Sequence, residues 1–156
     1  MAKEIERKFL FDPRKLPPLP DPLVIKQGYI PAENATVRIR TMNDNAFLTL
    51  KGKATGITRS EFEYPVPYED ALKMLDELCA KPLIEKRRYR VEYRGHVWDV
   101  DIFEGENEGL FMAEVELQSE DEAVELPPWV MKEVTGDRRY YNSNLRVHPF
   151  ARFREP

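Results

Sequence analysis

Apolar and polar residues alternate with a period of two along most of the chain. Successive side chains of a strand point to opposite faces, so this alternation is typical of half-buried β-strands. Many alternating positions carry β-branched or aromatic residues, which favour strands. Turn-forming stretches, such as Asn43-Asp44-Asn45, separate several of the segments. We therefore predict eight strands, at residues 3–11, 23–30, 35–41, 46–52, 58–66, 83–93, 96–103 and 110–118.

One segment has a clear helical period. In YEDALKMLDELC, residues 68–79, Leu72, Leu75 and Leu78 recur at the spacing that brings side chains to one face of a helix. Acidic residues fall in the first turn, where the positive end of the helix dipole stabilises them. The segment is predicted to form an amphipathic α-helix, with Cys79 on its apolar face.

Weaker signals mark three further segments. Ser119-x-x-Glu122 resembles a capping box and predicts a short helix that begins at Ser119. We expect short helical turns in the tail from Pro127 to Phe150. The stretch from Asp12 to Pro22 contains five of the 13 prolines, and it is too short to link two domains. We expect it to be an ordered or semi-rigid surface loop.

Eight strands with few helices indicate a closed or nearly closed antiparallel barrel. We predict an α+β protein in which a closed eight-stranded antiparallel β-barrel forms a tunnel, with a few peripheral helices. The 156 residues suffice for one domain with its own core, so we expect a single domain over residues 1–156. A barrel of this size is filled by side chains or holds a small ligand.

Most of the strands carry charged residues on one face and apolar residues on the other. Such a charged face is ordinarily the solvated outside of a barrel with an apolar interior. The alternative is that the charges line the lumen, while the apolar face packs under helices and loops or at a dimer contact. Two features favour this alternative: charges of one sign cluster on several strands, and the apolar face has more large residues than one small lumen could hold. The charged face comprises Glu4, Glu6, Lys8, Arg38, Arg40, Lys51, Lys53, Arg59, Glu61, Glu63, Lys86, Arg88, Arg90, Asp99, Asp101, Glu114 and Glu116.

The composition narrows the range of partners. The net charge of -4 argues against broad nucleic-acid binding, which ordinarily needs a basic surface. No apolar run approaches the length of a membrane span, and no signal-peptide pattern opens the chain. The single cysteine, Cys79, excludes an intramolecular disulfide. We expect a cytoplasmic protein that binds neither nucleic acid nor membranes.

A lumen with acidic and basic sides suits one class of ligand. Clustered carboxylates repel one another unless a cation lies among them, and their hard oxygens suit Mg²⁺ or Mn²⁺. Clustered arginine and lysine side chains attract anions, and the arginine fork matches phosphate. A metal-bound polyphosphate would satisfy both sides at once.

The charged motifs follow one another in an order that is similar to that of a known protein family. Glu4-x-Glu6-x-Lys8 resembles the ExExK signature of the CYTH superfamily, the triphosphate tunnel metalloenzymes. The resemblance extends to about Asn142 and so includes nearly the whole chain. GITRSEFEYPV is particularly similar to the compact bacterial inorganic triphosphatases. Further segments that resemble the family's elements, in its order, are KQGYI, VRIR, LTLKGK, TRSEFEYPV, IEKRRY, DVDIFEG, AEVELQSE and VTGDRRYYN.

The resemblance implies roles for these residues. It implies a site for Mg²⁺ or Mn²⁺ made by Glu4, Glu6, Glu114 and Glu116, together with Asp101. It implies a second metal, or an oriented water molecule, at Glu61 and Glu63. It implies a triphosphate clamp made by Lys8, Arg38, Arg40, Lys51, Arg59, Lys86, Arg88 and Arg138. It implies catalytic roles for Lys8, Tyr29, Arg40 and Glu63.

One position departs from the family pattern. Where related sequences often have Lys-Arg-Tyr, this chain has Arg138-Arg139-Tyr140. Arg138 keeps the positive charge, but arginine and lysine contact phosphate differently.

The resemblance implies hydrolysis of a small-molecule substrate, inorganic tripolyphosphate, to pyrophosphate and phosphate inside the lumen. Hydrolysis of nucleoside or thiamine triphosphates, or a class IV-type adenylate cyclase activity, would use the same tunnel. A non-catalytic polyphosphate-binding module would keep the basic residues and lose the carboxylates, which this chain retains. The apolar outer face would also suit a homodimer.

Overall fold

Nine strands are present in the part of the chain that the computed structural model describes, residues 3–146 and 149–150. The eight predicted strands are confirmed, each to within one or two residues at either end. The predicted extent of the domain, 1–156, includes residues outside the described ranges and stays a prediction. The strands are β1 (Lys3–Phe11), β2 (Leu23–Ile30), β3 (Thr36–Met42), β4 (Asn45–Lys51), β5 (Thr58–Pro65), β6 (Ile84–Tyr93), β7 (His96–Phe103), β8 (Phe111–Glu116) and β9 (Val130–Glu133).

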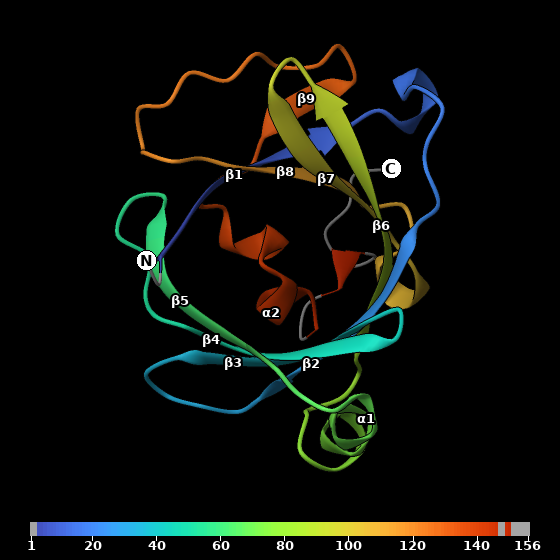
Figure 1. Cartoon of the computed structure of the whole chain (residues 1–156), viewed down its shortest axis with the longest axis vertical. Helices are drawn as coiled ribbons and strands as arrows, with labels where there is room; N and C mark the ends of the chain where they lie inside the picture. The colour runs from blue at the N-terminus through green and yellow to red at the C-terminus, as the bar shows by residue number, and fades with distance from the viewer. Residues whose placement is uncertain (1–2, 147–148, 151–156) are drawn as a thin grey trace.

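The sheet closes on itself through β1. The strands follow the order β5-β4-β3-β2-β6-β7-β8-β1, and β1 pairs antiparallel with β8 on one side and with β5 on the other. The β1–β8 register covers residues 6–10 of β1, and the β1–β5 register covers residues 3–5. Figure 1 shows the resulting ring of strands end-on. The predicted closed eight-stranded antiparallel barrel is therefore confirmed.

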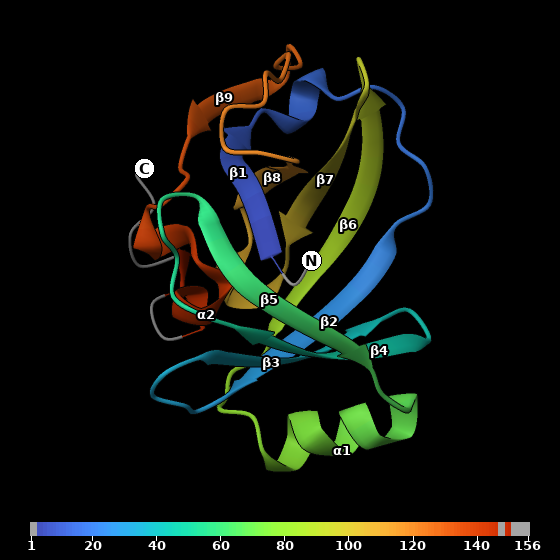
Figure 2. The ribbon, with the colours of Figure 1, turned by 60° about the vertical axis from the view of Figure 1, so that its left-hand side comes forward.

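The predicted helix is also confirmed, as α1 (Tyr68–Glu77). It lies outside the barrel, across β2, β3 and β4 (Figure 2). Its buried Ala71 and Leu75 pack with Ile39 of β3, Ala46 of β4 and Cys79. None of the described helices is long and apolar enough to span a membrane.

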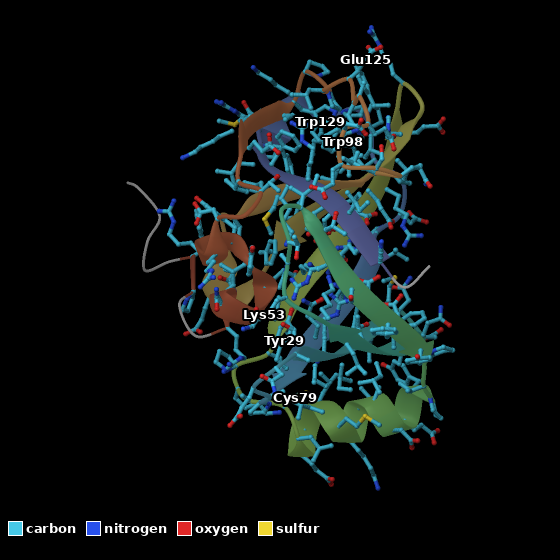
Figure 3. The ribbon with its side chains drawn as sticks, turned by 90° about the vertical axis from the view of Figure 1, so that its left-hand side faces the viewer. Tyr29, Lys53, Cys79, Trp98, Glu125 and Trp129 are labelled. Atoms are coloured by element: carbon cyan, nitrogen blue, oxygen red, sulfur yellow. The ribbon has the colours of Figure 1, made fainter. Side chains whose placement is uncertain are left out.

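A second part of the apolar outer face is covered by loops and by β9. Trp98 of β7 packs edge-on against Trp129, with their ring centroids 5.7 Å apart (Figure 3). The loop after β1, which begins with a 3-10 turn (η1, Pro13–Lys15), packs Leu16 and Leu19 against the same cluster. The expectation of an ordered loop is thus confirmed. The apolar face is outside and is covered in these regions, and the charged face lines the lumen.

Part of the outer apolar face has no cover within the described chain. Phe62 and Tyr64 of β5 are 44% and 54% exposed. The homodimer that the apolar outer face suggested stays a prediction.

The lumen is charged along only part of its length. At one end the inward positions become apolar. On the inward face of β6, Ile84 lies next to Lys86, and on that of β7, Phe103 lies next to Asp101. These apolar side chains pack with Leu145 of α2 (Asn142–Leu145), which Figure 1 shows within the outline of the ring. The C-terminal segment thus closes one end of the barrel over an apolar layer.

The ninth strand, β9, lies in the tail after Pro127, where we predicted helical turns and no strand. β9 pairs with β1 outside the barrel, with Phe9 opposite Glu133. Arg7 donates from Nε and Nη2 to the two carboxylate oxygens of Glu133, at 2.9 and 2.8 Å. A strand of four residues has only two side chains on each face, which is too few to give a periodic signal.

The predicted helix at Ser119 is wrong. The segment forms one turn, with the Glu122 amide 3.2 Å from the Ser119 carbonyl oxygen. The Glu122 carboxylate accepts from the amide of Gln118, and the Ser119 hydroxyl donates to Asp121. The two side chains of the capping box are therefore engaged elsewhere. The expected helical turns of the tail are present as η3 (Arg138–Tyr140) and α2, and a further 3-10 turn is η2 (Gly105–Asn107).

Gly28 of β2 permits the close approach of the segment that follows α1. A Cβ atom at Gly28 would lie 2.7 Å from Cδ2 of Leu83 and 2.8 Å from Cβ of Cys79. Such contacts are far inside van der Waals distance, so Gly28→Ala requires α1 or β2 to shift. We expect it to lower the free energy of unfolding by about 1–3 kcal/mol, measured by urea denaturation.

Gly52→Ala is the matched control. A Cβ there would meet Ser60 Cβ at 3.5 Å, an ordinary contact, so its stability should stay within about 0.5 kcal/mol of wild type. Equal stabilities of wild type and Gly28→Ala would contradict the close packing at this position.

Candidate active site

The register of the strands brings distant charges together in the lumen. Glu6 lies opposite Glu116, and Lys8 lies opposite Glu114, across β1 and β8. Across β7 and β8, Asp99 lies opposite the same Glu114. Paired residues of an antiparallel sheet share one face. Charges from both ends of the chain therefore meet in one space.

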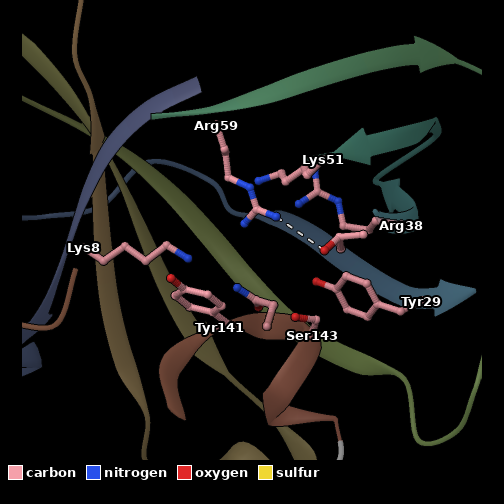
Figure 4. Close-up of a pocket in the computed structure, with 9 residues that line it drawn as sticks. Lys8, Tyr29, Arg38, Lys51, Arg59, Tyr141 and Ser143 are labelled. Atoms are coloured by element: carbon pink, nitrogen blue, oxygen red, sulfur yellow. Dashed lines mark hydrogen bonds between the residues drawn. The ribbon is translucent and has the colours of Figure 1, made fainter. Parts of the chain in front are cut away.

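One cavity in the lumen is lined mainly by cations and hydroxyl groups. Figure 4 shows Arg38, Lys51 and Arg59 on one side, Lys8 on another, and Tyr141 between them. Ammonium and guanidinium groups that converge from several strands suit a polyanion, because each can contact a different phosphate oxygen. The residues that line this cavity, called here the cationic cavity, are Lys8, Tyr29, Thr36, Arg38, Lys51, Arg59, Tyr141, Asn142 and Ser143.

Arg38, which lines this cavity, has an unpaired donor. Its Nη2 lies 3.3 Å from the Thr49 hydroxyl and 3.5 Å from the Glu63 carboxylate. Its buried Nε has no hydrogen-bond partner among the described residues. Leaving a buried donor unpaired costs about 1–3 kcal/mol, so an anionic oxygen within reach of Nε would be stabilising.

Arg59 is held in place from two sides. Its Nε donates to the carbonyl oxygen of Gly52 at 3.0 Å, and its Nη2 lies 3.4 Å from the Thr36 hydroxyl (Figure 4). These contacts leave Nη1 for a ligand. The guanidinium is therefore oriented before any ligand binds.

A second cavity shares Lys8, Arg59 and Tyr141 with the first and adds the carboxylates of Glu4 and Glu6. Burial, together with the charge of Glu114, raises the pKa of Glu6 to about 8. Burial also acts on Glu114, but Lys8, Arg88 and Lys86 hold the pKa of Glu114 well below its ordinary value. A cation beside both carboxylates would favour their ionised forms.

The expected separation of acidic and basic sides is incomplete. The ammonium of Lys51 lies 2.7 Å from Glu4 and 3.4 Å from Glu61. Burial acts to raise the pKa of Glu4, but Lys51 and a hydrogen bond with Glu61 together outweigh it, and the Glu4 pKa is lowered. Burial and a hydrogen bond with Glu4 raise the pKa of Glu61 to about 7. The signs mix here because β4, β5 and β1 are consecutive in the ring, so their inward side chains meet.

Asp101 lies among cations rather than among the other carboxylates. Arg88 binds it through two hydrogen bonds of 2.8 and 2.9 Å, and the ammonium of Lys86 lies 2.7 Å from its Oδ2. Burial would raise the pKa of Asp101, but Arg88 and Lys86 lower it. Burial lowers the pKa of Lys86 to about 7, although the charge of Asp101 acts in the opposite direction. The distance of 2.7 Å between the Lys86 ammonium and Asp101 Oδ2 is nevertheless that of an ion pair. Both oxygens of Asp101 are thus already used.

The carboxylates fit a divalent cation in chemistry but not in their present positions. Among the described residues, no three histidine, cysteine, aspartate or glutamate side chains converge closely enough to hold a metal ion. Glu4, Glu6 and Glu114 nevertheless offer hard oxygens in a buried space, and the raised pKa of Glu6 reflects its burial first and the charges of Glu114 and Glu4 second. Binding would require the side chains to rotate.

Two lumen residues were not identified by the sequence motifs although the strand period marks them. Gln27 shares a face with Tyr29, and Thr49 shares a face with Lys51. Gln27 is fully buried and hydrogen-bonds Arg40 and Tyr29. Thr49 donates to Glu63 at 2.9 Å. Each lies two residues from a predicted lumen residue on the same strand, and this spacing could have identified it.

Two more come from the C-terminal segment, where no strand period could reveal them. The ammonium of Lys8 lies 5.3 Å from the centre of the Tyr141 ring, within cation–π range. Asn142 Oδ1 accepts a hydrogen bond of 3.1 Å from Lys86. Both side chains line the cationic cavity.

The structure separates the predicted clamp into groups. Lys8, Arg38, Lys51 and Arg59 line the cationic cavity. Arg40, Lys86 and Arg88 are buried in the lumen behind it, each held by a protein acceptor. Arg138 is exposed and lines neither of the two cavities described here. The roles assigned to these residues stay predictions.

Relatives with assigned functions span nearly the whole chain. An inorganic triphosphatase of Acetivibrio thermocellus is 46% identical over 156 residues, with 99% of this chain and 100% of the relative covered. An inorganic triphosphatase of Nitrosomonas europaea is 35% identical over 152 residues, with 92% of this chain and 97% of the relative covered.

A solved structure is similar over the same extent. The crystal structure of an inorganic triphosphatase superposes with a TM-score of 0.66 at 32% identity, covering 92% of this chain and 97% of that chain. The family model described as the CYTH domain matches residues 2–143. The chain therefore belongs to the CYTH domain family, as the ExExK motif and the order of its strands predict.

Proposed function

We propose that the protein hydrolyses inorganic tripolyphosphate to pyrophosphate and orthophosphate with the help of Mg²⁺ or Mn²⁺. The observation that carries the proposal is the cationic cavity, which shares Lys8 and Arg59 with a second cavity that contains carboxylates. A metal-bound polyphosphate matches both. Two relatives of this length, at 46% and 35% identity, are inorganic triphosphatases.

The cations of the cavity would bind the phosphate chain. Arg38 offers its unpaired Nε, and Arg59 is oriented by Gly52 and Thr36. Lys8 and Lys51 would contact further phosphate oxygens from β1 and β4. Groups held in place before the reaction stabilise charge on the transferred phosphoryl group without reorganising.

The carboxylates Glu4, Glu6, Glu114 and Glu116 would hold the divalent cation, with a second ion or a water molecule at Glu61 and Glu63. When bound, the cation supplies neutralising charge to the phosphate oxygens. We leave Asp101 out of this set because Arg88 and Lys86 already occupy both of its oxygens.

The reaction itself needs one water molecule and one proton acceptor. The water oxygen attacks the terminal phosphorus in line, the bond to the bridging oxygen breaks, and pyrophosphate leaves. Glu61, whose pKa is raised to about 7, can take the proton of the water near neutral pH. Arg38 and Glu63 adjoin each other and can orient the phosphoryl group and the water.

The first test is an assay of four substrates. Purified protein with Mg²⁺ or Mn²⁺ should release phosphate from tripolyphosphate in preference to ATP, thiamine triphosphate or pyrophosphate.

Lys8→Ala should lower kcat/KM about 100- to 1000-fold, because it removes a positioned cation. Lys53→Ala removes an exposed cation near the same tunnel and should change it less than about threefold. Cyclic AMP and pyrophosphate as products from ATP would refute the proposal.

The second test is metal binding in the absence of substrate. Added Mg²⁺ or Mn²⁺ should raise the melting temperature of the wild-type protein, because the cation relieves repulsion among the carboxylates. Glu6→Gln removes one charged ligand and should reduce this shift by at least half. The measurement is differential scanning fluorimetry after treatment with a chelator. An equal shift in wild type and in Glu6→Gln would exclude Glu6 from the site.

The third test concerns Asp101. Asp101→Asn leaves the buried Lys86 without its ion-pair partner and leaves Arg88 with Asp99 alone, so the free energy of unfolding should fall by about 3–5 kcal/mol. The metal-induced rise in melting temperature should persist in this variant. A variant of unchanged stability that had lost the metal-induced rise would identify Asp101 as a ligand after all.

A further inference from the structure

Gln27 lies between a cation and a phenol in the lumen. Its Oε1 accepts a hydrogen bond of 2.7 Å from Nε of Arg40, and its Nε2 donates one of 2.9 Å to Oη of Tyr29. The side chain is fully buried. Both ends of the amide are therefore used within the protein.

The direction of this chain of hydrogen bonds is fixed by Arg40. A guanidinium has donors only, so the amide oxygen of Gln27 must face it and the amide nitrogen must face Tyr29. The Tyr29 oxygen then has to accept, which directs its own proton elsewhere. Among residues 3–146 and 149–150, the Tyr29 hydroxyl donates to no acceptor.

The free proton of Tyr29 is available to the cationic cavity. Tyr29 lines that cavity, and Figure 4 shows its oxygen directed into it, on the side of Arg38 and Ser143. A hydroxyl that cannot point its proton back into the protein is a preset donor to a phosphate oxygen. A phenol without the Gln27 contact could serve either as donor or as acceptor.

We propose that Gln27 is a positioning residue, which sets Tyr29 as a hydrogen-bond donor to the phosphate chain and holds Arg40 in place. This inference rests on the proposed function. The close packing of the backbone supports the proposal. Gly28, which lies between Gln27 and Tyr29 in the sequence, packs against Leu83 and Cys79, and this contact restrains the strand that carries both side chains. Glutamine meets both requirements, since it accepts at one end and donates at the other.

Replacing Gln27 with glutamate keeps the acceptor for Arg40 and removes the donor to Tyr29. In Gln27→Glu the carboxylate still accepts from Arg40, but it also accepts from Tyr29 and so turns the phenol proton away from the cavity. The added charge repels the substrate as well, whether or not Tyr29 is present. A double-mutant cycle with Tyr29→Phe isolates the part that acts through Tyr29.

The experiment measures kcat/KM for tripolyphosphate in wild type, Gln27→Glu, Tyr29→Phe and the double variant. The expected cost of Gln27→Glu is about 10- to 100-fold greater when Tyr29 is present than in the Tyr29→Phe background, which is the value of one hydrogen bond to a charged group. Gln118→Glu, the same change at an exposed position, should have less than a twofold effect. An equal cost of Gln27→Glu in both backgrounds would overturn the proposal.

A binding measurement keeps this result apart from the proposed function. Calorimetric affinities of the four proteins for tripolyphosphate without metal should show the same non-additivity, even if wild type failed to turn tripolyphosphate over. Absence of turnover in wild type would refute the proposed function, whereas additive affinities would refute the role of Gln27. Should thermal denaturation show that Gln27→Glu does not fold, Gln27→Met removes the same donor without adding charge and replaces it in the cycle.

Discussion

The barrel depends on its buried charges being paired, most of them with a counter-charge within a few ångströms and Arg40 with the neutral amide oxygen of Gln27. Transferring an isolated charge from water to a protein interior costs several kcal/mol, and only well-placed partners offset this. Asp101 meets the condition by binding Arg88 and Lys86 on the neighbouring strand, and Glu4 meets it by binding Lys51. Lys8, Arg88 and Lys86 meet it for Glu114, whose pKa is held well below its ordinary value. Glu6 meets it less well, and its raised pKa is the sign. Where pairing within the protein is weakest, an external ligand has the most to contribute.

A charged interior also dictates what surrounds the barrel. Because the lumen takes the polar faces of the strands, their apolar faces point outward and must be covered. The helix α1 covers β2 to β4, and the loops with Trp129 and β9 cover the aromatic cluster around Trp98. The peripheral elements are therefore a requirement of the inverted barrel. At the far end of the lumen, α2 closes an apolar layer in the same way.

The strands and the orientation of their faces could be predicted because a period of two persists over long segments. The inward charges could be predicted for the same reason. The family could be predicted from the ExExK motif together with the order of the strand motifs that follow it. The partner of each charge could not be predicted, because the partners of Asp101 and of Glu114 depend on which strands lie beside them in the barrel. Tyr141 and Asn142 escaped notice because they follow a 3-10 turn, where no period relates them to the lumen. Arg138, read from a motif alone, lies on the surface.

The closure of the ring links the site to the order of folding. β1 pairs with β8 and β5, so the first strand of the chain completes a sheet whose other seam is made more than 100 residues later. Contacts so distant in sequence are costly in chain entropy and form late. Glu6 and Glu114 therefore come together only when β1 pairs with β8 and the barrel closes. During synthesis, β1 cannot pair with β8 until residues 111–116 have been added, so the charges that these two strands contribute can meet only then.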